Sequence, residues 1–143
     1  MNDCHDFFGS VGVEKSNQLP IDAAQALLFC DLLGKKDEET HIRAFPHKKS
    51  KRRDELKARS EKILTYDIYE IEKINLEERS VYAVVNDGGT SDSDITDCRA
   101  IFCEWGDKSI EWQIKAWKKL GLPEPTFQVL TGGKSVHSYW VFK

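Results

Sequence analysis

The sequence has no long apolar run and no N-terminal segment with the order of a signal peptide. A helix that crosses a bilayer needs about 18 or more apolar residues in succession, and no stretch of the chain approaches that length. A signal peptide begins with basic residues and continues with an apolar run, whereas this chain begins MNDCHDFFGS. We therefore expect a cytoplasmic protein without a membrane partner.

The cysteines show no CxxC spacing. A secreted disulfide framework would need a higher density of cysteine, so we interpret the thiols as reduced. Structural zinc sites usually draw their ligands from close pairs, and a site that combines Cys98 and Cys103 with Cys4 and His5 therefore stays a minor alternative. The four cysteines of the chain are Cys4, Cys30, Cys98 and Cys103.

The chain also lacks an overall positive charge. Its formal net charge is -3, so the protein as a whole has no general attraction for nucleic-acid phosphates. Residues 47–62 are the exception, because they hold eight Lys or Arg against three acids. Lys51, Arg52 and Arg53 in this segment are candidate DNA contacts. The alternative is a solvated loop that runs into a helix.

Length and composition indicate one globular domain that spans residues 1–143. The 40% hydrophobic content supports a packed core, and the chain mixes helical and strand patterns. Such a mixture predicts an α/β or α+β fold, in which helices pack on a mixed sheet. The predicted helices cover residues 20–34 and 109–121, and the predicted strands cover residues 40–45, 80–85, 99–105, 126–130 and 136–142.

The apolar spacing in the two helices predicts which faces are buried. The first helix would bury Ile21, Ala24, Leu28 and Leu32, and the second would bury the side that carries Ile110, Ile114, Trp117 and Gly121. Ser109 is a typical N-cap for the second helix, and Gly121 is a typical stop. The strand that contains Ile101 and Phe102 is expected to be buried.

The segment 127–143, FQVLTGGKSVHSYWVFK, reads as a hairpin with glycines at its bend. A hairpin does not itself require Lys134, Ser135 or His137. Side chains two residues apart share a face of a strand, so Ser135, His137 and Tyr139 are expected side by side. The polar face therefore requires an explanation beyond the turn.

Glu104 is an acid within an otherwise apolar strand. A buried carboxylate without a partner is costly, so Glu104 should either form an ion pair or open on a cleft at the end of the strand. An acid two residues further on would place two carboxylates in one metal site, but that position is Gly106. Asp107 follows directly and reaches the same site only if the strand alternation breaks there.

Residues 81–143 resemble the catalytic core of the archaeo-eukaryotic primase superfamily, in particular the primase-polymerases of phages and plasmids. The stretches that carry the resemblance are VYAVVNDGG, DITDCRAIFCEWGD and LGLPEPTFQVLTGGKSVHSYWVF. In that superfamily one motif places two acids one residue apart at a strand end, and a second motif has the form Ser-x-His after a glycine-rich turn. Glu104 matches the first acid, and Ser135 with His137 match the second motif.

The resemblance implies a set of roles for these residues. Glu104, Asp107 and His137 would be catalytic, with the two acids holding Mg²⁺ or Mn²⁺. His137 and Ser135, with Lys134 beside them, would contact the phosphates of a nucleoside triphosphate. Arg43 is a further candidate nucleotide contact, with an ordinary surface arginine as the alternative.

The implied reaction is nucleotidyl transfer in DNA replication, as a DNA primase or polymerase performs it. Its partners would be single-stranded or primed DNA and a helicase or other replication protein, in the host cytoplasm if the protein is of phage origin. Two features depart from the pattern. Gly106 replaces the second acid, and the chain ends six residues after His137, before a third acidic motif. We therefore expect the N-terminal part of such a core.

Three alternatives remain open. A catalytically inactive relative would keep the fold and bind nucleotide or single-stranded DNA. A structural domain would pair Glu104 with His137 and bind no nucleotide. The aspartates at 87, 92, 94 and 97 could hold Ca²⁺, although the twelve-residue calcium loop pattern is absent and aspartate is common in turns.

Overall fold

The computed structural model of the protein describes residues 22–35, 39–64, 67–131 and 133–142. Cys4 and His5 of the alternative zinc site, Ile21 and Gly132 lie outside these residues. The described elements, in chain order, are α1 (Ala23–Leu32), β1 (Glu39–Pro46), β2 (Arg59–Leu64), α2 (Ile68–Leu76), β3 (Arg79–Ala83), the short 3₁₀ helix η1 (Asp92–Asp94), β4 (Ala100–Cys103), α3 (Ile110–Ile114), α4 (Ala116–Lys119), β5 (Phe127–Leu130) and β6 (Val136–Val141).

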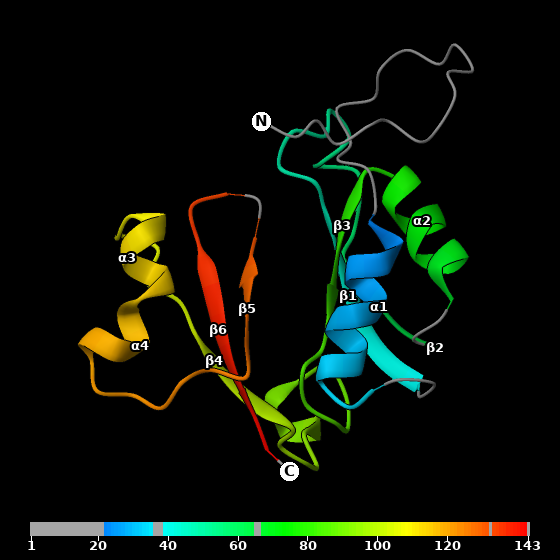
Figure 1. The fold of residues 1–143 in the computed structure, drawn as a ribbon. Coiled ribbons are helices and arrows are strands. Elements are labelled where there is room, and N and C mark those ends of the chain that lie inside the picture. The colour runs from blue at the N-terminus through cyan, green and yellow to red at the C-terminus, as the bar shows by residue number, and fades with distance from the viewer. Residues whose placement is uncertain (1–21, 36–38, 65–66, 132, 143) are drawn as a thin grey trace.

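The first sheet has the antiparallel order β2-β1-β3, and α2 packs on it (Figure 1). Its core is aliphatic and consists of Ile42, Ala44 and Ile63 from the strands and Ile74 from α2. The alternation of β1 explains this arrangement, because Ile42 and Ala44 face the core while Arg43 between them is exposed.

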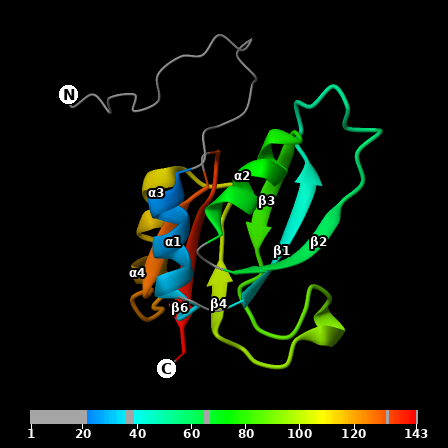
Figure 2. The ribbon, with the colours of Figure 1, turned by 90° about the vertical axis from the view of Figure 1, so that its right-hand side faces the viewer.

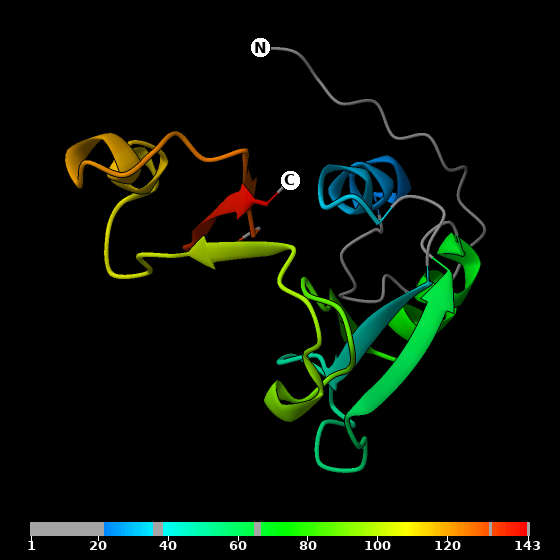
Figure 3. The same cartoon turned by 90° about the horizontal axis from the view of Figure 1, so that it is seen from below.

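The second sheet has the antiparallel order β4-β6-β5. The helices α3 and α4 lie on its outer side, and α1 lies on the side toward the first sheet (Figure 1). Phe29 of α1 meets the rings of Phe127 and Tyr139 edge to face, with centroids 5.8 and 5.5 Å apart. Seen from below, the two sheets diverge and α1 lies between them (Figure 3).

The predicted α+β class is confirmed, with the strands divided between two small sheets. The hairpin is also confirmed, since β5 and β6 pair antiparallel from Phe127 opposite Tyr139 to Leu130 opposite Val136. The helix that the alternative interpretation placed after the basic loop is wrong, because Arg59–Leu64 forms β2 and pairs with β1. Figure 2 shows the loop between β1 and β2 projecting from the sheet. No helix among the described residues is long and apolar enough to cross a bilayer.

The predicted buried face of α1 is wrong. Leu28 is 55% exposed and Leu32 is also exposed, whereas Phe29, Cys30 and Leu33 face the second sheet or the space between the sheets. The helix carries apolar residues on nearly every side, so their spacing does not determine which side is buried. Packing against the aromatic rings of β5 and β6 makes that choice.

The predicted faces of the later elements are also partly wrong. The helical segment is interrupted at Lys115, between α3 and α4, and it buries Gln113 and Ala116 while Ile114 is exposed. The caps are confirmed, because Ser109 accepts a hydrogen bond from the Trp112 N–H and Gly121 has a positive φ of 68°. The predicted burial of β4 holds for Ala100 but not for Ile101 and Phe102, which are each about half exposed.

Candidate active site

Glu104 and His137 meet at the end of β4. Cys103 lies opposite Ser138 in the antiparallel register, so the next residues, Glu104 and His137, face each other on one side of the sheet. The distance between His137 Nε2 and Glu104 Oε2 is 2.9 Å. This is the pairing that the structural-domain alternative predicted, and with side chains 26% and 49% exposed it is accessible to solvent.

Two aromatic residues orient the imidazole of His137. The ring of Phe102 stacks on it with centroids 5.2 Å apart, and His137 Nδ1 lies 3.4 Å from the Tyr139 hydroxyl oxygen. Burial raises the pKa of Tyr139, so its hydroxyl stays protonated and can donate to Nδ1. The tautomer with the proton on Nε2 therefore satisfies both contacts, because Nε2 then donates to Glu104.

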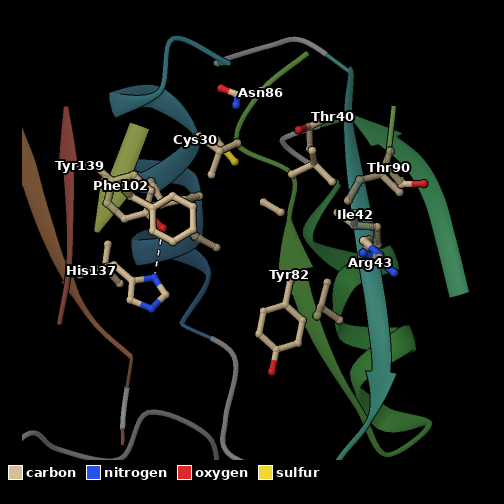
Figure 4. A pocket seen from close by; sticks show the side chains of 18 of the residues that line it. Cys30, Thr40, Ile42, Arg43, Tyr82, Asn86, Thr90, Phe102, His137 and Tyr139 are labelled. Carbon is tan, nitrogen blue, oxygen red and sulfur yellow. Dashed lines mark hydrogen bonds between the residues drawn. The ribbon is translucent and has the colours of Figure 1, made fainter. Parts of the chain in front are cut away.

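A cavity of about 800 Å³ lies between the two sheets, and α1 forms one of its walls. Arg43 and Tyr82 line it from the first sheet, where they are direct neighbours in the pairing of β1 and β3. Phe102, His137 and Tyr139 line it from the second sheet (Figure 4). Two predicted nucleotide contacts from distant parts of the sequence, Arg43 and His137, thus line one cavity.

Ser135 lies beside Gly106. A Cβ atom added at Gly106 would be 3.3 Å from Ser135 Oγ, so the turn after β4 and the turn before β6 are in close contact. The β5–β6 turn is closed by Thr131, whose N–H and hydroxyl both donate to the Ser135 carbonyl oxygen. Lys134 is exposed on this turn. Ser135 and Lys134 therefore lie near the position of the acid that the chain lacks.

Asp107 does not join the contact between Glu104 and His137. Its carboxylate is largely exposed and lies 2.9 Å from Lys108 Nζ. The hydrogen bond from Lys108 lowers the pKa of Asp107, which is therefore ionised at neutral pH. The role of Asp107 as a metal ligand stays a prediction, and it would require this carboxylate to turn away from Lys108.

Gln113 joins α3 to the turn before His137, a role that the sequence did not indicate. Its side chain is completely buried. Nε2 donates to the carbonyl oxygens of Lys108 and Lys134, and Oε1 accepts the N–H of Val136. One amide thereby satisfies three backbone groups, and it fixes the segment from which Ser135 and His137 project.

A second missed feature is a polar cluster formed by Lys35, Asp87 and Arg99 and called here the inter-sheet clasp. The Lys35 side chain is only 2% exposed, and Lys35 Nζ lies 3.3 Å from Asp87 Oδ1. Nζ also donates to the carbonyl oxygens of Val84 and Asn86. Arg99 donates through Nε to Asp87 at 2.5 Å. The clasp connects the end of α1 with the exit from β3 and the entry to β4.

Burial and charge oppose each other in the clasp. Desolvation lowers the pKa of Lys35, and the attraction of Asp87 offsets part of this effect. Burial by itself would raise the pKa of Asp87, but the hydrogen bonds and charges of Arg99 and Lys35 outweigh it and lower that pKa. Because Asp87 has these partners, its position is explained without a bound Ca²⁺.

Lys51, Arg52 and Arg53 lie in the loop between β1 and β2. All three are exposed, and none is among the described residues that line the cavity. Arg52 forms an exposed ion pair with Glu55, a contact that contributes little to stability. The structure therefore leaves these charges available to solvent but does not bring them to the candidate site. Their contact with DNA stays a prediction.

The divalent metal implied by the resemblance can be tested against the residues that are present. Within the described part of the chain, no three His, Cys, Asp or Glu side chains are grouped so that they could hold a metal ion. Glu104 supplies one accessible carboxylate, which is hydrogen-bonded to the cavity-lining His137 but does not itself line the cavity. Mg²⁺ in nucleotide sites is often held by one or two carboxylates together with substrate phosphates, so Glu104 fits one shared ion. The described residues do not provide the acid pair expected of a two-metal site.

The structure is similar to a solved one, the AEP domain of the primase-polymerase of cyanophage S-2L. The TM-score is 0.72 and the sequence identity is 41%. The resemblance to a primase-polymerase core is confirmed. The match covers 85% of this chain, which is much more than residues 81–143, and the chain spans 62% of that AEP domain chain. No family model matches the sequence, and no curated protein matches it either.

Proposed function

We propose that this primase-polymerase-like chain binds a nucleoside triphosphate in the cavity between its sheets and serves DNA primase- or polymerase-type nucleotidyl transfer. One observation carries the proposal. Arg43 of the first sheet and His137 of the second line the same cavity, and His137 is hydrogen-bonded to Glu104. The similarity to a phage primase-polymerase domain supports the proposal at the level of the family.

The polar groups around the cavity suit a triphosphate. Arg43 offers a permanently charged guanidinium, and His137 offers an N–H donor, so phosphates between the two sheets would have donors on both sides. Ser135 and Lys134 on the adjoining turn would extend the donor set. The aromatic side chains of Tyr82 and Phe102 give the cavity apolar surface against which a base and sugar could pack.

Glu104 would change partner when nucleotide binds. Its contact with His137 competes with phosphate for the same N–H, so binding requires Glu104 to turn away. Glu104, and Asp107 if its pair with Lys108 opens, are the residues that would hold Mg²⁺ or Mn²⁺. The chemistry that such an ion supplies is stabilisation of charge on the reacting phosphate oxygens.

In the proposed reaction a 3′-hydroxyl on single-stranded or primed DNA attacks the α-phosphate. The new bond joins the 3′-oxygen to the α-phosphorus, the hydroxyl proton passes to water, and the bond from that phosphorus to the oxygen bridging to the β-phosphate breaks, so pyrophosphate leaves. Arg43 and His137 would hold the phosphates in line and stabilise the charge that develops on the leaving group.

A second candidate function is nucleotide binding without catalysis. Gly106 stands where the resemblance has an acid, and Asp107 is paired with Lys108. Both observations favour a module that keeps the site for phosphates but lacks the second carboxylate that transfer requires. Both candidate functions predict that a nucleoside triphosphate binds in the cavity. They differ only in whether the bound nucleotide is then transferred to DNA.

Calorimetric titration with dGTP and with GTP, each with and without Mn²⁺, tests the proposal. His137→Ala should weaken binding at least about tenfold, because it removes a donor that meets charged phosphate. His41→Ala is the matched control, since His41 lies on β1 outside this cavity and should leave binding unchanged.

Two results would contradict the proposal. One is the absence of nucleotide binding by a chain whose circular dichroism shows the folded state. The other is an equal affinity of the His137→Ala variant and the unaltered protein. Binding that depends on His137, without incorporation into a primed template, would favour the binding module over the enzyme.

A further inference from the structure

A cluster of tryptophan and lysine side chains lies on α3, α4 and the turn before them, outside the cavity. Trp105 and Trp112 meet edge to face, with ring centroids 5.9 Å apart. Lys108 Nζ lies 6.0 Å and Lys119 Nζ 5.4 Å from the centroid of the Trp112 ring. Both lysines are exposed, and both indoles are partly exposed. These four residues are called here the tryptophan–lysine surface.

The same pattern continues along α4. Lys118 Nζ lies 5.1 Å from the centroid of the Trp117 ring. Residues 108–119 contain four lysines and one acid, whereas the whole chain has a net charge of -3. Lys108 also pairs with Asp107, which offsets one of these charges. The outer side of the second sheet is thus locally basic and presents aromatic rings between its charges.

This combination matches the chemistry of single-stranded nucleic acid. Unpaired bases stack on aromatic side chains in a way that tolerates any sequence, while lysines neutralise the phosphates between them. A lysine over an indole can exchange that contact for a phosphate at little cost, because an exposed cation–π contact is weak. The basic loop at 47–58 differs, since it has charge but no Trp, Tyr or Phe.

The surface is rigidly connected to the candidate active site. Trp105 follows Glu104 directly in the chain. The next residue, Gly106, lies beside Ser135 of the turn before β6. Gln113 holds α3 to the turn that carries Lys134. Figure 1 shows α3 beside the upper end of the β5–β6 hairpin, where this turn lies. A strand lying over Trp112 and Trp105 would reach the cavity around the end of β4.

We propose that the tryptophan–lysine surface binds single-stranded nucleic acid and guides it to the site between the sheets. Bases stack on the rings of Trp105 and Trp112, and Lys108 and Lys119 contact the adjoining phosphates. The binding step itself stands without nucleotide or metal. The surface's part in the reaction rests on the proposed function, which the titration of dGTP and GTP tests separately.

The experiment is a titration with oligothymidylate of about 20 nucleotides, long enough for a site of this kind, without nucleotide or metal. Intrinsic tryptophan fluorescence reports stacking, and polarisation of a dye on the oligonucleotide reports binding. We expect fluorescence quenching and an affinity that falls at least about fivefold in Trp112→Leu. Trp112→Phe keeps a stacking face and should recover most of the affinity.

The lysines are tested by the salt dependence of binding. Lys119→Ala should reduce the slope of log affinity against log salt by about 0.7, because one phosphate contact to a single strand is lost. Lys73→Ala on α2 is the matched control, an exposed helical lysine on the other sheet. Trp140→Phe is the control for fluorescence, since the indole N–H of Trp140 is bound to the Pro123 carbonyl oxygen.

Several outcomes would overturn the proposal. One is a folded chain that binds nucleotide but no oligothymidylate. Another is unchanged oligonucleotide affinity in folded Trp112→Leu and Lys119→Ala proteins. Equal binding of duplex DNA or of polyglutamate would show that unstacked bases are not what the surface recognises. A matching series with oligouridylate distinguishes DNA from RNA, and either strand on this surface supports the proposal.

A different pattern would show that the proposed function fails while this inference holds. In that case oligothymidylate binding depends on Trp112 and Lys119, but neither dGTP nor GTP binds in the cavity. In the reverse pattern, nucleotide binding depends on His137, but Trp112→Leu leaves the oligonucleotide affinity unchanged. That result would contradict the role of the tryptophan–lysine surface and support the nucleotide site in the cavity.

Discussion

The two sheets of the molecule have cores of different chemistry. The first sheet packs aliphatic side chains of β1, β2 and α2 around Ile74. The second sheet packs aromatic rings of β5, β6 and α1 around Tyr139, and the buried amide of Gln113 ties α3 to it. The first sheet contributes Arg43 and Tyr82 to the cavity, and the second contributes His137, which is hydrogen-bonded to Glu104.

The difference shows where precision is needed. An aliphatic core tolerates shifts of its strands, because dispersion and burial have no preferred direction. Hydrogen bonds and ring stacking have directions, so they hold the imidazole of His137 in one orientation. We therefore expect changes in the first sheet to act mainly on stability and changes in the second to act also on binding.

Ile74→Ala should have the largest effect on stability. It removes a fully buried side chain from the aliphatic core and should lower the free energy of unfolding by about 3 kcal/mol. Urea unfolding followed by circular dichroism measures this change. Leu76→Ala, an exposed site on the same helix, should stay within about 0.5 kcal/mol of the unaltered chain. At a temperature where the Ile74→Ala variant is folded, its nucleotide affinity should be unchanged. A large loss of affinity would contradict the expectation that the first sheet acts mainly on stability.

Gln113→Leu should combine a smaller loss of stability with a loss of nucleotide binding. The apolar side chain leaves the buried Val136 N–H without its partner, which should cost about 2 kcal/mol, whereas the partly buried carbonyl oxygens of Lys108 and Lys134 can turn to water. The turn that carries Ser135 would loosen, and dGTP affinity should fall about fivefold by calorimetry. Gln128→Leu is the control, because this partly exposed amide lies on β5 outside the turn. If the folded Gln113→Leu variant keeps its full affinity for dGTP, the link between α3 and the turn is not needed for nucleotide binding.

Gly106→Asp should affect binding rather than stability, because it adds a second acid to the second sheet. The added Cβ would lie 3.3 Å from Ser135 Oγ, a contact that a small movement of the serine hydroxyl relieves. Nucleotide affinity in Mn²⁺ should rise several-fold, because two carboxylates then face one site. Gly106→Asn has nearly the same size without the charge and should show no rise. Primer extension by the Asp variant alone would identify a damaged enzyme.

Asp87→Asn should have the smallest effect, and it is visible in the pH dependence of stability. The folded pKa of Asp87 is lowered, so its contribution is complete above the unfolded value of about 3.9 and is lost as pH falls from there through the lower folded pKa. The variant should therefore lose less stability than the unaltered protein between neutral pH and pH 3. Thermal unfolding at several pH values measures this, and parallel curves would mean that Asp87 contributes nothing.

Local patterns predicted most elements of the fold. The caps Ser109 and Gly121 and the alternation in the hairpin are properties of neighbouring residues, and they were confirmed. The facing of Glu104 and His137 also follows from alternation once β4 is placed beside β6. The buried face of α1 did not follow, because its apolar residues surround the helix.

Long-range polar contacts could not be predicted in the same way. Lys35 looks like an ordinary lysine after a helix, and only its contacts with Val84 and Asn86, 49 and 51 residues further on, make it a buried group. Gln113 likewise has no signal in its neighbours, since its partners include Lys134 and Val136 from a distant turn. The role of Asp107 stays a prediction from the resemblance, and the DNA contacts of Lys51, Arg52 and Arg53 stay predictions from local charge.

The inter-sheet clasp has a consequence for the order of folding. The β1–β2 and β5–β6 hairpins join strands that are near in sequence, whereas Arg99 reaches the Gly34 carbonyl oxygen across 65 residues. Closing a long loop costs more entropy than closing a short one, so we expect the two hairpins to form before the clasp joins the sheets. Lys35 must also give up its water at that step. The cavity would then be the last part of the protein to assemble, and a ligand that spans it would bind only the completely folded chain.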